Sequence, residues 1–463
     1  MANTPLVKQV AHWVQSFDPI HIPKEVKAQA GLLVLDSLGC ALAALDEETA
    51  HATRRAVDGL GGKEECTIIG SNQKTSVTNA VLMNGALIRT LDLNDFLQGA
   101  NGAGHPSDNI AVALAMTERQ GGSGADMLAA IILGYELYGR IRDLATEESP
   151  WDHVTASGLV APVIAGRLLG LDEEKMAHAL AFGAAHCHAL RSVRGGQLSA
   201  AKSLANAIVT QTATLGTLLA AEGLTGPMKV LEGSYGLGEA IFPGADLNSL
   251  VAPLGGHFRI MDASIKAYPC IGTAQTAVAA AIQAKQNLKN PLAEIERIEI
   301  FMADTPFVSG QVNNPERRMP ASRETADHSF PFLVAVALLD GMLTPRQFHG
   351  QRWLDPSIRT LMERITIQTD PSLNTYIPAS FPAVIKIAKT DHTSHTVEVP
   401  YAPGHPRNRL TASGVAAKFH SCAERTLSEP LRNAIVSEVA NLDGLPHLDR
   451  LMHLLAKPVS GRN

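Results

Sequence analysis

One short segment of the chain concentrates groups that could carry out acid–base chemistry. Asp92 and Asp95 precede His105 in a stretch rich in Gly and Pro, and an apolar run begins at Ile110. Gly and Pro favour turns, so we expect His105 on a connection rather than on a packed helix face. The apolar run predicts a helix, which a side chain from residues 107–109 could cap. A histidine on its own is more often structural, so the interpretation depends on its companions.

Cationic and imidazole side chains recur along the rest of the chain. They are His153 after Pro150, Arg191 and Arg194 beside a glycine turn, Lys202, Lys266 and His328. Lys202 is expected in the first turn of a helix, where a cation opposes the macrodipole and needs an anionic partner. Taken singly, the arginines could bind carbonyl groups at a helix end, and the lysines could extend to water. The alternative is that all these groups converge.

Convergence would create a site for a small polyanion. Two like charges about 4 Å apart repel by about 4 kcal/mol at an effective dielectric near 20, so a polycarboxylate in a cleft needs several cations. Arginine can pair with a carboxylate through two hydrogen bonds, and lysine can neutralise the charge that develops on an enediolate. The sequence can supply such a site for a di- or tricarboxylate despite a net charge of −6.

Other chemistries find little support in the sequence. His186 and His188 flank Cys187, but this segment is expected to be helical, where residues i and i+2 do not share a face. The glycine-rich turns lack the strand context and the Lys-Ser/Thr pair of a phosphate loop, and the chain has neither an HExxH nor a GxSxG motif. We therefore expect no metal site and no serine on a nucleophile elbow.

Composition narrows the class of protein. With 463 residues, 45% hydrophobic content and 5% aromatic content, the chain can form two domains with a core of closely packed helices. It has no run of Lys and Arg, which argues against a nucleic-acid partner. Its five cysteines are far apart with no CxxC pair, as in a reducing compartment. Without a secretion signal or an apolar stretch expected to span a bilayer, we predict a cytoplasmic protein with no membrane partner.

The hydrophobic pattern changes along the chain. Residues 5–255 are predicted to form helix after helix, whereas residues 298–302, 365–368, 383–388 and 396–399 alternate as strands do. We predict a mainly α protein with a large all-helical domain, residues 1–264 plus 404–463. A smaller α+β domain, residues 265–403, would be inserted before the C-terminal helices. The region between the two is the expected place for a site.

Several segments together resemble the MmgE/PrpD family, which includes 2-methylcitrate dehydratase, cis-aconitate decarboxylase and iminodisuccinate epimerase. The similar segments are residues 104–109 (GHPSDN), 152–154 (DHV), 190–202 (LRSVRGGQLSAAK), 266–270 (KAYPC), 327–329 (DHS) and 404–408 (GHPRN). They occur in family order between about Leu35 and Phe419. The resemblance implies a helical domain plus a smaller α+β domain, a homodimer with its site between domains, and no required cofactor.

The resemblance also implies roles for individual residues. The pocket residues of the family match Asp92, His105, His153, Lys202 and Lys266. The pattern R-x-x-R-x-G-x-L-S-x-x-K, typical of the dehydratase-like branch, covers Arg191, Arg194, Ser199 and Lys202. With Asp95 and His328, the two arginines and Ser199 are the expected substrate contacts. The chain departs from the family at Ala201, Ile271 and Pro331–Phe332, which replace an aromatic, a histidine and a Gln-Tyr pair.

These observations lead to the hypothesis of a hydro-lyase that dehydrates a citrate-like hydroxy acid. His105 or His153 would take the proton next to a carboxylate, and the other histidine or Asp92 would assist the hydroxyl to leave. Lys202, Lys266 and the arginines would neutralise the enediolate. The alternatives are a decarboxylase or epimerase of a related polycarboxylate, and a polycarboxylate-binding protein without activity.

Overall fold

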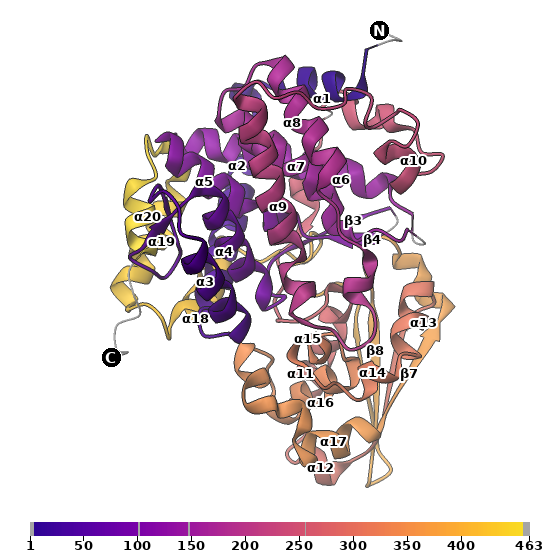
Figure 1. Ribbon diagram of the computed structural model, residues 1–463. Coiled ribbons are helices and arrows are strands. Elements are labelled where there is room, and N and C mark those ends of the chain that lie inside the picture. The colour runs from indigo at the N-terminus through magenta and orange to yellow at the C-terminus, as the bar shows by residue number, and fades with distance from the viewer. Residues whose placement is uncertain (1–3, 101, 147–148, 255, 457–463) are drawn as a thin grey trace.

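The computed structural model describes residues 4–100, 102–146, 149–254 and 256–456, and the fold is mainly α-helical (Figure 1). The first part of the chain forms helices α1 Leu6–Gln15, α2 Lys24–Ala43, α3 Glu48–Leu60, α4 Val77–Thr90, α5 Ile110–Gln120, α6 Gly124–Leu144, α7 Ser157–Leu168, α8 Glu173–His186, α9 Ala200–Ala221 and α10 Leu237–Ile241. The last part adds α18 Ala412–Ala423, α19 Glu429–Ala440 and α20 Asp449–Leu455. α18 and α19 both pack on α2, so the two ends of the chain share one hydrophobic cluster.

Small residues allow the helices of this cluster to approach closely. α9 lies against α4, α7 and α8. Where α7 meets α8, a Cβ added to Gly183 would lie 1.9 Å from the carbonyl oxygen of Gly158, so no larger residue fits there. Helix ends follow local rules as well: the Asp172 side chain accepts a hydrogen bond from the backbone N–H of Lys175 at 2.8 Å and caps α8.

The prediction that this part is entirely helical is wrong. Strands β1 Cys66–Thr67 and β2 Lys74–Thr75 form one antiparallel pair, and β3 Phe96–Gly99, β4 Gly102–Gly104 and β5 Ala263–Ser264 form a three-stranded antiparallel sheet in the order β4-β3-β5. These strands are two to four residues long, too short to show a period-two pattern. The small sheet matters because β4 leads directly into His105.

A second hydrophobic cluster draws on residues between 270 and 399. Its helices are α11 Gln275–Lys285, α12 Pro291–Glu294, α13 Pro306–Val312, α14 Pro315–Arg318, α15 Arg323–Ala326, α16 Phe330–Asp340 and α17 Pro356–Glu363. Its strands β6 Ile295–Ala303, β7 Ile365–Asp370, β8 Ala383–Lys389 and β9 Ser394–Val399 form a sheet in the order β7-β6-β8-β9, in which only β6 and β7 run parallel. α11 packs on α16 and against β8 and β9. This unit is the orange lower part of Figure 1.

Two helices are long and apolar enough to cross a membrane by length and composition, contrary to the expectation from the sequence. They are α2 and α9, and 67% and 56% of their apolar windows are buried inside the protein. Burial of that extent is what a core helix shows, so the two helices are accounted for by the packing described above.

Candidate active site

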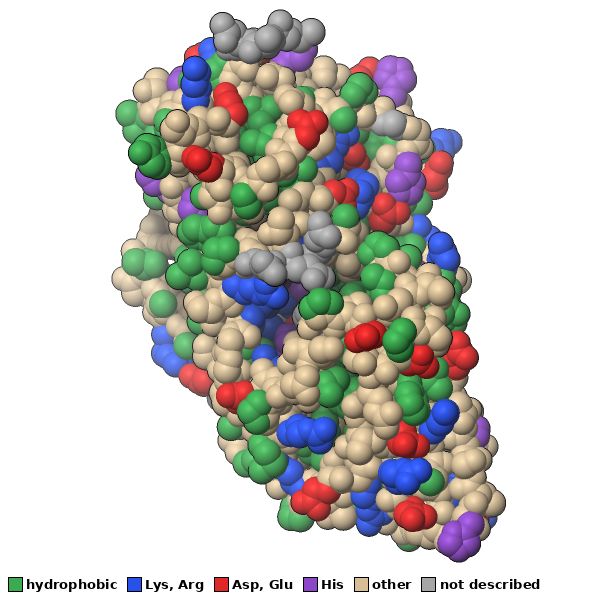
Figure 2. Space-filling model, turned by 90° about the vertical axis from the view of Figure 1, so that its right-hand side faces the viewer, with side chains coloured by type: hydrophobic (Ala, Val, Ile, Leu, Met, Phe, Trp, Pro, Cys, Tyr) green, Lys and Arg blue, Asp and Glu red, His purple; other side chains and the backbone are tan. Residues whose placement is uncertain are grey.

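A cavity of about 420 Å³ opens between the two clusters, and residues of both line it. Figure 2 shows a hollow between the two lobes with Lys/Arg and His side chains visible inside. The charged and imidazole side chains that line the cavity are Arg89, Asp92, His105, Arg142, Asp152, His153, Arg191, Arg194 and His328. Most of the site residues predicted from the sequence therefore meet at one place, although they come from distant parts of the chain.

Asp92 lies at the centre of a buried cluster of cations. It follows α4 with a φ of +49°, a left-handed conformation that a non-glycine residue rarely adopts. Lys202 Nζ donates to Asp92 Oδ2 at 2.7 Å, and Arg89 Nη1 donates to Oδ1 at 2.7 Å. Lys266 Nζ donates to Oδ1 and to the Asp92 backbone oxygen, the latter at 3.0 Å. Burial raises the pKa of Asp92, but these three cations outweigh it and hold that pKa well below the ordinary value.

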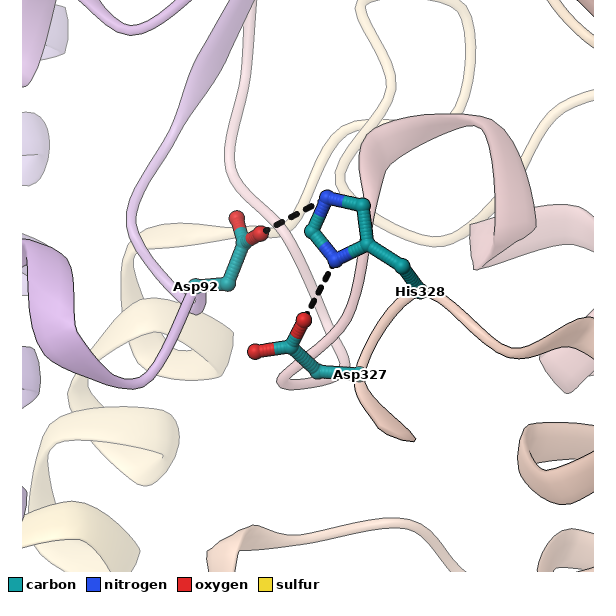
Figure 3. Close-up of side chains that lie close together, drawn as sticks. All are labelled: Asp92, Asp327 and His328. Carbon is teal, nitrogen blue, oxygen red and sulfur yellow. Dashed lines mark hydrogen bonds and ion pairs between the residues drawn. The ribbon is translucent and has the colours of Figure 1, made fainter. Parts of the chain in front are cut away.

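His328 lies between two carboxylates (Figure 3). Its Nδ1 is hydrogen-bonded to Asp327 Oδ1, and its Nε2 lies 3.8 Å from Asp92 Oδ2. Burial and the nearby Lys202 lower the pKa of His328 to about 4, so the ring is neutral near pH 7 and Nδ1 carries its hydrogen. The three side chains offer possible metal ligands within 4.8 Å of one another. However, Lys202 Nζ lies 2.7 Å from Asp92 Oδ2 and 3.5 Å from Asp327 Oδ1, so an ammonium already lies between the two carboxylates.

His105 and His153 lie side by side, with ring centroids 5.2 Å apart. His105 Nδ1 lies 2.6 Å from the backbone oxygen of Asp95, an acceptor, so Nδ1 carries the hydrogen and Nε2 has a free lone pair. The Tyr138 hydroxyl accepts from the backbone N–H of His105 at 3.1 Å and lies 3.2 Å from His153 Nδ1. Gly104 makes room for this tyrosine, because a Cβ there would lie 2.2 Å from its oxygen.

The two histidines differ in which nitrogen is engaged. If the Tyr138 hydroxyl donates to His153 Nδ1, the hydrogen of His153 is on Nε2, on the side of Asp152 Oδ1 at 3.8 Å. Burial lowers the pKa of both histidines well below the ordinary value, and nearby arginines lower it further. Both rings are therefore neutral near pH 7. His105 Nε2 thus offers a proton acceptor, and with the hydrogen on Nε2 His153 offers a hydrogen-bond donor beside it.

The arginines around the cavity are not equivalent. Arg194 pairs with Asp152 through two hydrogen bonds, of which Nη2 to Oδ1 measures 3.0 Å. Arg191 is exposed at the edge of the cavity. Arg142, in the last turn of α6, has a buried Nε without a hydrogen-bond partner, and no described carboxylate forms an ion pair with its guanidinium. Burial lowers the pKa of Arg142, with a further contribution from the charge of Arg191. Arg142 thus has donors left over for an anion.

Several sequence-based assignments need correction. Asp95 is buried away from the cavity, where Oδ2 accepts from the Tyr135 hydroxyl at 2.8 Å and its backbone holds His105. Burial raises the pKa of Asp95 to about 7. Ser199 is exposed just before α9 and does not line the cavity. Neither is therefore placed to bind substrate. Lys202 and Lys266 are each 1% exposed and contact Asp92, so they lie beneath the cavity rather than in its wall.

The capping prediction for the helix at Ile110 is also wrong. Residues Pro106–Asn109 form a 3-10 helix that continues into α5, and no side chain caps α5. Asp108 Oδ1 instead accepts from Asn94 at 2.7 Å, and the Asn109 side chain donates to Ser157 at 3.1 Å. These bonds fix the segment that carries His105.

Sequence reasoning missed four groups that build the site. Arg89 and Arg142 looked like ordinary helix residues, and Tyr138 looked like part of an apolar core. A charged residue inside the apolar helix 77–90 was the available signal for Arg89. Lys418 of α18 was also missed: it donates to the backbone oxygen of Leu93 at 2.9 Å and lies 2.5 Å from Asp36 Oδ1, which fixes the chain next to Asp92.

Comparison with known proteins gives one consistent result. The model of the MmgE/PrpD N-terminal domain matches residues 8–250, and that of the MmgE/PrpD C-terminal domain matches residues 268–443. The chain is 26% identical to cis-aconitate decarboxylase of Mus musculus, over 95% of this chain and 91% of that protein. It is 28% identical to 2-methylcitrate dehydratase of Cupriavidus necator, over 89% and 90%. For the 2-methylcitrate dehydratase of Escherichia coli K12 the identity is 27%, over 81% of each chain. This chain therefore belongs to the MmgE/PrpD family.

Proposed function

We propose that this protein is a lyase that removes water from a small citrate-like hydroxy acid, without a cofactor. The observation that carries the proposal is the pair of neutral histidines, 5.2 Å apart, in which His105 Nδ1 is engaged by the Asp95 backbone oxygen and Nε2 is left to accept a proton. Relatives with the names 2-methylcitrate dehydratase and cis-aconitate decarboxylase both catalyse lyase reactions, which supports the class of reaction.

The charges around the cavity suit a polycarboxylate. The cations in its wall or directly beneath it are Arg89, Arg142, Arg191, Arg194, Lys202 and Lys266. The carboxylates among them are Asp92, Asp152, Asp327 and Asp108, whose Oδ2 lies 3.7 Å from Arg89. Even with all four ionised, a surplus of two positive charges remains. A substrate with two or three carboxylates would balance that surplus, and the free donors of Arg142 would hold one of them.

In this proposal His105 is the base that removes the proton and later returns it, and His153 donates a hydrogen bond to the leaving hydroxyl group. His105 Nε2 removes the proton next to a substrate carboxylate, and the bonding electrons move onto that carboxylate to form an enediolate. The surplus cations stabilise its charge, because they are fixed in place before the reaction begins. The carbon–oxygen bond then breaks. His153 Nε2–H stabilises the departing hydroxide by a hydrogen bond, and the hydroxide takes the proton held by His105 Nε2 and leaves as water, which returns both rings to their neutral form.

The second candidate is a decarboxylase, favoured by the extent of the match to cis-aconitate decarboxylase. Three relatives with that name are 25–26% identical over 95–99% of this chain. The same pocket would stabilise the carbanion left when carbon dioxide departs next to a carboxylate. An epimerase would use the two histidines on opposite faces of one carbon. The identities to the two kinds of relative are similar, so the reactions are distinguished by their products.

The test is to incubate the purified protein with 2-methylcitrate, citrate and cis-aconitate. Dehydration of the first two gives a conjugated acid that absorbs in the ultraviolet, with no carbon dioxide. Release of carbon dioxide from cis-aconitate would instead support the decarboxylase. Tight binding of citrate without conversion of any compound would leave a binding protein. His105→Gln should reduce turnover by about 10²- to 10⁴-fold, whereas His21→Gln, at a side chain that is 80% exposed and does not line the cavity, should leave it unchanged.

We further propose that the chain forms a homodimer in the cytoplasm. One face of α9 is apolar and exposed, with Ile208, Leu215 and Leu219 between 36% and 52% exposed, and residues 203–221 include no charged side chain. Such a face suits contact with a second copy. Sedimentation of the wild type as a dimer and of Leu215→Asp as a monomer would support it. A monomeric wild type would rule it out.

A further inference from the structure

One side chain of helix α6 joins the two segments that carry the paired histidines. α6 packs against the 3-10 helix Pro106–Asn109, which follows His105, and against the 3-10 helix His153–Ala156. The Tyr138 hydroxyl accepts from the backbone N–H of His105 at 3.1 Å. The same oxygen lies 3.2 Å from His153 Nδ1 and 3.4 Å from the His153 backbone oxygen. A single hydroxyl group therefore contacts both segments.

Close packing holds Tyr138 in this position. Its side chain is buried, and a Cβ added to Gly104 would lie 2.2 Å from the hydroxyl oxygen and 2.6 Å from Cε1. Gly104 belongs to β4 and pairs with Leu97 of β3, so the absence of a side chain at this point of the small sheet admits the tyrosine ring. The hydroxyl group is thus in place before a substrate binds.

The hydroxyl has one hydrogen to donate, and its acceptor determines where His153 carries its own hydrogen. Burial raises the pKa of Tyr138, so the hydroxyl stays protonated near pH 7. Because the His105 N–H occupies one of its lone pairs, the remaining partners are His153 Nδ1 and the His153 backbone oxygen. If Nδ1 accepts, the ring carries its hydrogen on Nε2. If the backbone oxygen accepts, Nδ1 carries the hydrogen.

A nearby carboxylate distinguishes these two arrangements. Asp152 Oδ1 lies 3.8 Å from His153 Nε2. Burial raises the pKa of Asp152, but Arg194 outweighs it and holds that pKa well below the ordinary value, so Asp152 is ionised. A bare Nε2 would bring a lone pair close to this negative charge, whereas Nε2–H brings a hydrogen. The shorter contact and the charge therefore both favour donation from Tyr138 to Nδ1.

We infer that Tyr138 is a positioning residue that fixes His153 with its hydrogen on Nε2 and holds the two imidazole rings in their relative places. Tyr138 does not line the cavity, so it acts through the histidines. The inference rests on the proposed function, in which His153 Nε2–H stabilises the departing hydroxide. The hydrogen bond at Nδ1 gives each ring its role: the Asp95 backbone oxygen leaves His105 with a bare Nε2, and Tyr138 leaves His153 with Nε2–H.

Nitrogen NMR tests the state of His153 without turnover. In protein labelled with nitrogen-15 in its histidine rings, protonated and bare ring nitrogens give widely separated signals. The signals that disappear in His153→Gln are those of His153. Near pH 7 the wild type should show a bare Nδ1 and a protonated Nε2 for this ring. A protonated Nδ1 would overturn the inference, and this measurement needs no variant of Tyr138.

Two variants test the part played by the hydroxyl. Tyr138→Phe removes the donor, so the Nδ1 signal of His153 should move to the position of a nitrogen that accepts no hydrogen bond. Tyr135→Phe is the matched control, one turn earlier on α6. Tyr135 is equally buried and donates to Asp95 Oδ2 at 2.8 Å, so its replacement should leave the His153 signal in place. An unchanged signal in Tyr138→Phe would overturn the inference.

Rates separate the inference from the proposed function. Tyr138→Phe should lower kcat by about 10- to 100-fold, because the His153 ring is no longer held in its productive orientation. The Kd for tricarballylate, a citrate analogue with no hydroxyl to lose, should stay nearly constant. An unchanged kcat would overturn the inference. If the wild type converts no hydroxy acid, the proposed function fails, while the nitrogen signals still decide whether Tyr138 fixes His153.

Discussion

Replacing Arg142 by Gln should weaken substrate binding and, at the same time, stabilise the free protein. The side chain lines the cavity, its Nε is buried without a partner, and no described carboxylate pairs with it. A hydrogen bond to a charged group is worth about 1.5–3 kcal/mol, so its loss should raise KM by roughly 10- to 150-fold. In the absence of substrate the same guanidinium is a cation removed from water and next to Arg191. Its removal should therefore raise the free energy of unfolding by up to about 1 kcal/mol.

The assay combines initial rates with urea unfolding, each with and without tricarballylate. Arg194→Gln is the matched control, because Arg194 already pairs with Asp152, whose side chain is 1% exposed. Arg194→Gln leaves the buried Asp152 carboxylate without its cation and should lower the free energy of unfolding by a few kcal/mol. Arg142→Gln and Arg194→Gln should thus shift stability in opposite directions. The reasoning is refuted if Arg142→Gln loses more than about 1 kcal/mol, or if its KM is unchanged.

Three further predictions follow from the buried groups. Lys202→Met should lower the free energy of unfolding by about 3–5 kcal/mol, since it leaves Asp92 and Asp327 without their shared ammonium; unchanged denaturation midpoints would contradict that contact. His105→Gln should reduce kcat by about 10²- to 10⁴-fold with a nearly constant Kd for tricarballylate. Because burial lowers the pKa of His105, wild-type kcat/KM should not fall as the pH decreases from about 8 to 6.5. Asp95 has a pKa of about 7 in the fold against 3.8 unfolded, so its own contribution to stability is complete below pH 4 and is lost, by about 4 kcal/mol, as the pH rises from 4 through 7. Asp95→Asn should flatten the stability curve between pH 4 and 7, and a curve unchanged by Asp95→Asn would place that titration at another group.

Much of the secondary structure could be predicted because its causes are local. The apolar pattern predicted successive helices over residues 5–255, and helices α1 to α10 lie in that range. Strands β6 to β9 were found from their alternation. Strand β3 was not, since its pairing joins Phe96 to Ser264, far away in sequence, and its neighbour β4 is only Gly-Ala-Gly. No window along the sequence contains that information.

Which residues belong to the site could be predicted better than which of them line the cavity and which lie beneath it. Lys202 stood out because a cation in the first turn of an apolar helix is unfavourable without an anion, and Asp92 and Asp327 supply it. Whether a side chain faces the substrate or supports Asp92 depends on its direction in the folded structure, which residue type and spacing do not specify. Arg142 is the converse case. An arginine in the last turn of a helix normally lies in water, so nothing in the sequence indicated that this side chain lines the cavity.

The groups that build this site share one physical property: each costs stability where it stands. Asp92 adopts a left-handed backbone, His105 is buried without charge, and Arg142 has an unsatisfied buried donor. Such costs persist in a fold only where the surrounding structure imposes them, and here Arg89, Lys202 and Lys418 do so. A bound polyanion would relieve the unsatisfied donors and the surplus charge at once. The stability that the fold loses by holding these groups unpaired is therefore recovered when carboxylates bind to them. For this reason the removal of Arg142 should stabilise the protein and weaken substrate binding together.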